Sequence, residues 1–148
     1  MTNLKEIVEK IKNKDLEEAL KICDNYNDKN NQHIISNFKG VIFLINGDLE
    51  LSEKNLLISI ELKPKFEDPI KNLYSLFLKK KLFKKVLFYA EKLVEINSAN
   101  NEYNYQLAYA YELNHNFTDS LKFYNKYIDF DGNNKIQAFN NIGCLYLI

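Results

Sequence analysis

The 148-residue sequence contains few of the residues that interrupt or cross-link a fold: 4 glycines, 2 prolines and 2 cysteines. So few glycines and prolines argue against a sheet of many strands joined by tight turns. The cysteines, Cys23 and Cys144, are too far apart in the sequence to form a CxxC metal site, and one pair is no disulfide framework. This cysteine content is typical of a protein from a reducing compartment.

Arginine is absent, and 20 lysines balance 20 acidic residues, so the formal net charge is zero. A neutral chain lacks the basic field that draws proteins to nucleic acids or anionic membranes. No apolar run approaches the roughly 18 residues needed to cross a bilayer, and the opening segment has charges every few residues instead of the apolar centre of a secretion signal. We therefore expect a soluble cytoplasmic protein without a nucleic-acid or membrane partner.

Apolar residues, which make up 46% of the sequence, recur at helical spacing. Leu4, Ile7, Val8 and Ile11 are spaced three or four apart, as on one face of a helix, and alternation with a period of two is absent over any useful length. The sequence predicts an all-α fold.

The chain also repeats itself with a period of 34 residues, which is typical of stacked supersecondary units. At this shift apolar residues meet apolar residues, for example Leu73 with Leu107, Phe77 with Tyr111, Phe83 with Phe117 and Leu87 with Leu121. A shift of 33 pairs residues 15–17 with residues 48–50, both Asp-Leu-Glu. Each unit has the pattern of a helix, a short turn and a second helix.

The first helices carry a small residue followed three places later by an aromatic one: Gly40 with Phe43, Ala108 with Tyr111, and Gly143 with Tyr146. This pattern resembles the tetratricopeptide repeat (TPR). The resemblance implies an all-α, right-handed α-solenoid of antiparallel helix hairpins, with about four repeats and the first helix of a fifth. We place the repeats at 1–32, 33–66, 67–100 and 101–135, with a partial repeat at 136–148, in one array over residues 1–148.

A small residue is needed where two packed helices come closest, so we expect Gly40, Ala108 and Gly143 to lie at close helix contacts. The last helix ends in an apolar segment that includes Tyr146 and Leu147. We favour the interpretation that the chain is part of a longer repeat protein. The alternatives are that this helix packs on another copy or a neighbouring domain, or that it packs on the preceding repeat.

The sequence shows no constellation for chemistry. His33 and His115 stand beside asparagines at expected helix boundaries without a nearby partner, and no phosphate-binding, dinucleotide-binding or zinc-protease motif is present. We interpret Cys23 and Cys144 as helix residues, and the five lysines within 79–85 as a solvated turn in preference to a nucleic-acid or lipid patch. We expect no enzyme activity, no cofactor and no metal site.

In the TPR family, partners lie against the first helices, along the inner surface of the array, and the resemblance therefore implies a protein-binding scaffold. Carrying the inward positions over to this chain selects the following candidate partner-binding residues: Asn37, Val41, Lys71, Ser75, Tyr105, Tyr109 and Asn140. Tyrosine, amide and apolar groups favour an extended or helical peptide of low charge. For Tyr105 and Tyr109, packing on neighbouring helices is an equally weighted alternative.

One known function of the family can be compared directly with this sequence, the binding of acidic chaperone tails through a clamp of lysines, asparagines and an arginine. Ser75 follows Lys71 where the clamp has asparagine, and the chain has no arginine. The alternative to a scaffold is a regulatory or targeting repeat region of a larger protein whose catalytic or membrane part lies outside this chain. Self-association through the last helix is a further expectation.

Overall fold

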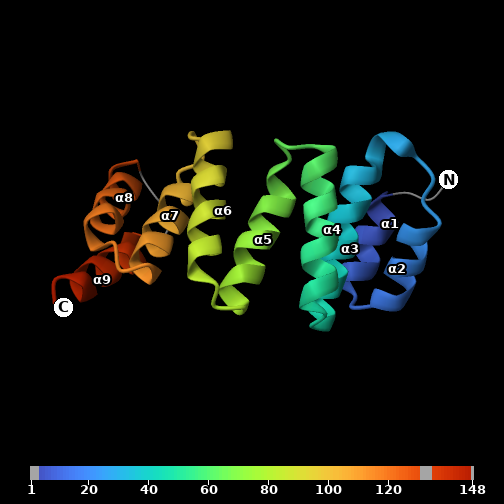
Figure 1. Cartoon of the computed structure of the whole chain (residues 1–148), viewed down its shortest axis with the longest axis horizontal. Coiled ribbons are helices and arrows are strands. Elements are labelled where there is room, and N and C mark those ends of the chain that lie inside the picture. Colours follow the sequence, from blue (N-terminus) through green and yellow to red (C-terminus); the bar gives the residue numbers. More distant parts are fainter. Residues whose placement is uncertain (1–3, 131–134, 148) are drawn as a thin grey trace. The chain divides into compact units, whose positions relative to one another are not determined.

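The computed structural model describes residues 4–130 and 135–147, and every regular element in these ranges is helical. The all-α expectation is confirmed. In chain order the elements are α1 (Leu4–Lys12), α2 (Leu16–Asp24), the short 3₁₀ helix η1 (Lys29–Asn31), α3 (Gln32–Asn46), α4 (Leu49–Leu62), α5 (Glu67–Lys79), α6 (Phe83–Ile96), α7 (Glu102–Leu113), α8 (Phe117–Asp129) and α9 (Lys135–Leu145) (Figure 1). None of the described helices has the length and apolar character required to cross a membrane.

The chain divides into two compact units, Met1–Leu76 and Phe77–Ile148, with the boundary inside α5. In unit 1, α1 packs on α2, α2 on α3, and α3 on α4. In unit 2, α6 packs on α7, α7 on α8, and α8 on α9. Neighbours in the sequence are therefore neighbours in space, which is the arrangement of successive helix hairpins.

Each unit has a core that spans three successive helices. In unit 1 one cluster of buried side chains comes from α1, α2 and α3: Ile7, Ala19, Ile22, Cys23, Ile35 and Ile42. In unit 2 one cluster comes from α7, α8 and α9: Ala108, Tyr124, Tyr127, Ala138 and Leu145. The third helix in each case covers the apolar side that the preceding hairpin leaves open, as expected for stacked hairpins.

Helices α3 and α4 of unit 1 come into close contact at Gly40. A Cβ atom on Gly40 would lie 2.6 Å from Cγ and Cδ2 of Leu56, so only glycine fits without a shift of the leucine. The Ser52 hydroxyl donates to the Gly40 carbonyl oxygen at 2.8 Å, and the Ser59 hydroxyl donates to the His33 carbonyl oxygen at 2.6 Å. The predicted close contact at Gly40 is confirmed.

The corresponding prediction for Gly143 is wrong. Gly143 is exposed, and a Cβ atom there would meet nothing within 4 Å. Its motif neighbours are also open: Phe139 is 57% exposed and Tyr146 74% exposed. The physical reason lies in the neighbouring helix. In the α3–α4 pair, the second helix covers this side of the first helix. Among the described residues, no second helix packs against the same side of α9.

The turns between paired helices share one backbone conformation. Lys14, Gly47, Lys81 and His115 all have positive φ angles, of 60°, 88°, 55° and 60°. These four positions are 33 or 34 residues apart, so the repeat is visible in the backbone as well as in the side chains. The left-handed conformation ends a helix readily when the residue is glycine, but it costs other residues about 1 to 2 kcal/mol.

We expect Gly40→Ala to lower the free energy of unfolding by about 1 to 3 kcal/mol, because the added methyl group overlaps Leu56. Gly143→Ala adds the same methyl group to a helix in open space, so it should leave stability unchanged or raise it by up to about 1 kcal/mol. Urea unfolding followed by circular dichroism measures both changes. Equal effects of the two substitutions would contradict this account of Gly40.

We also expect Lys14→Gly to raise the free energy of unfolding by up to about 1 kcal/mol, because glycine removes the steric cost of the left-handed turn. Lys14→Val is the control, since a β-branched residue suits this conformation less well than lysine and should lower stability. Thermal unfolding of the three proteins gives the order. A glycine variant no more stable than the valine variant would show that the turn carries no strain.

Candidate binding surfaces on the first helices

The predicted partner-binding residues of unit 1 differ in how accessible they are. Asn37 is only 5% exposed, and its Oδ1 atom accepts a hydrogen bond from Nδ2 of Asn72 at 2.9 Å. Val41 is half-buried, Ser75 is exposed, and the ammonium group of Lys71 lies 2.6 Å from a carboxylate oxygen of Asp68. The Asn37 oxygen is therefore engaged within the chain, whereas the Ser75 side chain is open to solvent.

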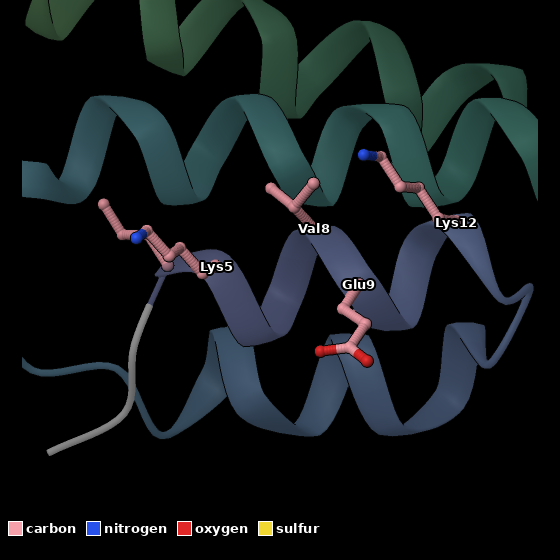
Figure 2. Close-up of a pocket in the computed structure, with 5 residues that line it drawn as sticks. Lys5, Val8, Glu9 and Lys12 are labelled. Carbon is pink, nitrogen blue, oxygen red and sulfur yellow. The ribbon is translucent and has the colours of Figure 1, made fainter.

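A cavity of about 390 Å³ lies on α1, at the first helix of unit 1. Its lining residues are Leu4, Lys5, Val8, Glu9 and Lys12. Figure 2 shows the side chains of Val8 and Lys12 pointing to one side of α1 and that of Glu9 pointing to the other. The lining therefore combines apolar side chains with charged groups that lie on both sides of the helix.

These residues were not among the sequence-based candidates, although the sequence contains a signal for them. Leu4 and Val8 stand 33 residues before Asn37 and Val41, at the shift that aligns the two Asp-Leu-Glu segments. Applying the inward positions to the first repeat at this shift would have selected Leu4 and Val8.

The cavity on α1 is suited to binding and carries no catalytic arrangement. Leu4 and Val8 supply apolar surface, and Lys5, Glu9 and Lys12 supply one acidic and two basic groups. A single carboxylate without a histidine or thiol beside it offers no acid–base pair or nucleophile. This surface can hold an apolar side chain of a ligand and polar groups on either side of it.

In unit 2, Tyr105 is held between neighbouring helices. Its ring centroid lies 5.5 Å from that of Tyr124 and 5.3 Å from that of Tyr127, both on α8. Nδ2 of Asn141 on α9 donates to the hydroxyl oxygens of Tyr105, at 3.2 Å, and Tyr124, at 2.8 Å. Burial raises the pKa of Tyr105 and Tyr124, so both hydroxyls stay neutral.

These contacts favour packing as the main role of Tyr105, the alternative that the sequence left open. The Tyr124 hydroxyl donates onward to Oε2 of Glu112 on α7 at 2.9 Å, so the network joins three helices. Tyr109 is half-buried against the same core, whereas Asn140 is exposed. Sequence reasoning missed Asn141, because a bridge between two tyrosines on different helices has no signature along the chain.

Comparison with known proteins gives no sequence-level match: no family model and no curated protein matches this chain. The fold does match solved structures. MamA 41-end from Desulfovibrio magneticus RS-1 has a TM-score of 0.81 and 19% identity, covering 95% of this chain and 80% of that one. The N-terminal domain of stress-induced protein-1 (STI-1) from C. elegans has a TM-score of 0.69 and 14% identity, covering 82% and 99%.

A third structure decides the type of repeat. The first TPR of Spaghetti (RPAP3), bound to the HSP90 peptide SRMEEVD, has a TM-score of 0.69 and 15% identity, covering 78% of this chain and 91% of that one. The chain has the tetratricopeptide-repeat fold. At these identities the likeness concerns the fold alone.

The titratable groups of the TPR chain are dispersed. In residues 4–130 and 135–147, no three histidine, cysteine, aspartate or glutamate side chains gather as they would around a metal ion. His33 packs edge-on against Phe66, with ring centroids 5.1 Å apart, and burial lowers its pKa. Cys23 is 2% exposed, and burial raises the pKa of its thiol to about 11, whereas Cys144 is exposed.

We expect a chromogenic disulfide reagent to react quickly with one thiol of the native protein at neutral pH. The thiolate is the reactive form, so the raised pKa and the burial of Cys23 both suppress its reaction, and Cys144 accounts for the fast phase. Cys144→Ser should abolish this phase, and denaturant should expose the Cys23 thiol in both proteins. Two thiols reacting at one rate in the native state would contradict the burial of Cys23.

Proposed function

We propose that the chain is a non-enzymatic protein-interaction module that binds an extended or helical peptide segment of low net charge along its first helices. The observation that carries the proposal is the cavity on α1, where Leu4 and Val8 occupy the positions that correspond to Asn37 and Val41 of the next repeat and charged side chains lie beside them. The TPR fold supports it, since a solved TPR with the same fold is bound to a peptide.

The chemistry of the first helices favours a ligand with apolar and amide-bonding groups. In unit 1, Leu4 and Val8 offer an apolar surface, and Ser75 offers an exposed hydroxyl. In unit 2, Asn140 offers an exposed amide that both donates and accepts hydrogen bonds. Backbone groups of a peptide are the natural partners of such amides and hydroxyls, and an apolar side chain is the natural occupant of the α1 cavity.

An acidic peptide is a poor fit to these first helices. The ammonium group of Lys71 is already paired with Asp68 at 2.6 Å, and Ser75 follows it where the chaperone-tail clamp has asparagine. The chain contains no arginine to form a bidentate bond with a carboxylate. A cytoplasmic location forms part of the proposal, supported by two cysteines that are both free thiols.

The test is the selection of binding peptides from a displayed random library with the full chain, followed by affinity measurement. We expect Val8→Thr to weaken a selected peptide by about threefold to tenfold, because it places a hydroxyl in the apolar lining at nearly constant volume. Asn140→Ala tests unit 2 separately: it should weaken, by about twofold to fivefold and without a change in stability, those selected peptides that Val8→Thr leaves unaffected, because Asn140 is exposed.

Lys54→Glu, on the exposed side of the second helix α4, is the matched control and should leave the affinity unchanged. Fluorescence polarisation with the labelled peptide measures all four proteins. Selected peptides that bind Val8→Thr and Asn140→Ala as tightly as the original chain would refute the proposed surface, and failure to select any peptide would refute the proposed function.

A further inference from the structure

A second cavity, of about 480 Å³, lies in unit 2, and none of its lining residues is among the first-helix residues considered above. It is formed by two turns, the one between α5 and α6 and the one between α7 and α8, which lie at the same end of their helices (Figure 1). Its lining residues are Lys81, Leu82, Phe83, Lys84, Lys85, Leu113, Asn114 and His115. The size is within the range of ligand-binding pockets.

A hydrogen-bonded asparagine ties the two turns together. Nδ2 of Asn114 donates to the carbonyl oxygen of Phe83 at 2.9 Å and to that of Ala110 at 2.8 Å. The first bond crosses between the turns and the second anchors the asparagine to its own helix, α7. The walls of the cavity are therefore fixed relative to each other before any ligand arrives, which lowers the entropic cost of binding.

The charge of this cavity is of one sign. Three of its lining residues are lysines, and residues 77–90 contain five lysines and no acidic residue. None of the lining residues is acidic; the two carboxylates nearest to the second turn in sequence, Glu112 and Asp119, accept hydrogen bonds from the Tyr124 hydroxyl and from Nδ2 of Asn116. The neutral chain thus carries a local basic site, and local positive potential attracts anionic ligands.

The floor of the cavity is apolar, which restricts the kind of anion that fits. Leu82 is 41% exposed, and Phe83 and Leu113 are half-buried beside it. An apolar floor under a rim of lysines complements a ligand in which carboxylates flank an apolar side chain. Free phosphate would leave this floor in contact with water, and a nucleic-acid backbone would lack the arginine that suits it best.

We propose that this cavity, formed by Lys81–Lys85 and Leu113–His115, is a binding site for an acidic peptide segment with an aliphatic or aromatic side chain between its carboxylates. Lys81 and Lys84 pair with the carboxylates, and Leu82 and Leu113 contact the apolar side chain. The ammonium group of the third lysine, Lys85, lies over the ring of Phe77, 4.5 Å from its centroid. This site is separate from the first-helix surface, so the chain offers one site for a peptide of low charge and another for an acidic one.

The probe is a fluorescein-labelled hexapeptide of alternating glutamate and leucine, titrated with the full chain in fluorescence polarisation. We expect the double variant Lys81→Glu, Lys84→Glu to weaken binding at least tenfold, because it replaces attraction by repulsion at two places. Raising the salt concentration should weaken binding to the original chain as well. Lys54→Glu, Lys63→Glu alters the net charge equally on unit 1 and should change the affinity less than twofold.

The apolar part of the site has its own variant, Leu82→Ser. Leu82 is the N-cap residue of α6, where serine stabilises a helix, so this variant folds at least as well while losing apolar floor. We expect it to weaken the glutamate–leucine probe at least threefold. A control hexapeptide in which serine replaces leucine should bind the original chain more weakly than the probe does. Leu82→Ser should leave the affinity of this control peptide unchanged.

Several outcomes would overturn the proposal. The first two are that the lysine double variant binds the probe as tightly as the original chain does, or that the leucine and serine peptides bind with equal affinity. The other two are that inorganic phosphate at the same charge concentration displaces the probe, or that a single-stranded RNA or anionic vesicles bind more tightly than the probe in a lysine-dependent way. Val8→Thr should leave the probe's affinity unchanged, which keeps this test independent of the one for the first helices.

Discussion

The close packing of antiparallel helices is the constraint on which the rest of the structure depends. A helix hairpin can bury only one side of each of its helices, so the next helix has to cover the remaining apolar side. The two cores show this directly, since Ile35 and Ile42 of α3 complete the core of α1 and α2, and Ala138 and Leu145 of α9 complete that of α7 and α8. The proposed binding positions depend on the same constraint, since Val8, Ser75 and Asn140 keep surface free of this packing whereas Asn37 and Tyr105 do not.

The fixed step between hairpins also places the turns at regular intervals, and this has a functional consequence. Left-handed residues recur at Lys14, Gly47, Lys81 and His115, and the last two line one cavity. The cavity combines lysines with the apolar residues Leu82, Phe83 and Leu113, and Asn114 links its two turns. Turns that have only a structural role in forming the repeat can therefore acquire a binding role through the charges they carry.

Much of the fold could be predicted from the sequence, and the candidate sites less so. Gly40 and Gly143 occupy similar motifs, yet only Gly40 lies against another helix. The motif predicts which side of its own helix the glycine lies on, but it does not predict whether another helix packs there. Tyr105 was selected by position alone, whereas its ring and hydroxyl contacts come from α8 and α9. The Asn141 bridge and the lysine-rimmed cavity depend on residues that only packing brings together.

The sequence by itself determined the helices, the period of about 34 residues and the pairing of neighbouring helices, because these depend on local spacing of apolar residues and on short connections. The tertiary structure decided which polar groups remain available to a partner. Asn37 is engaged with Asn72, Ser75 is open, and Lys81 and His115 share a cavity. The reason is physical: burial and hydrogen bonding depend on distances between residues far apart in the chain, which local patterns do not encode.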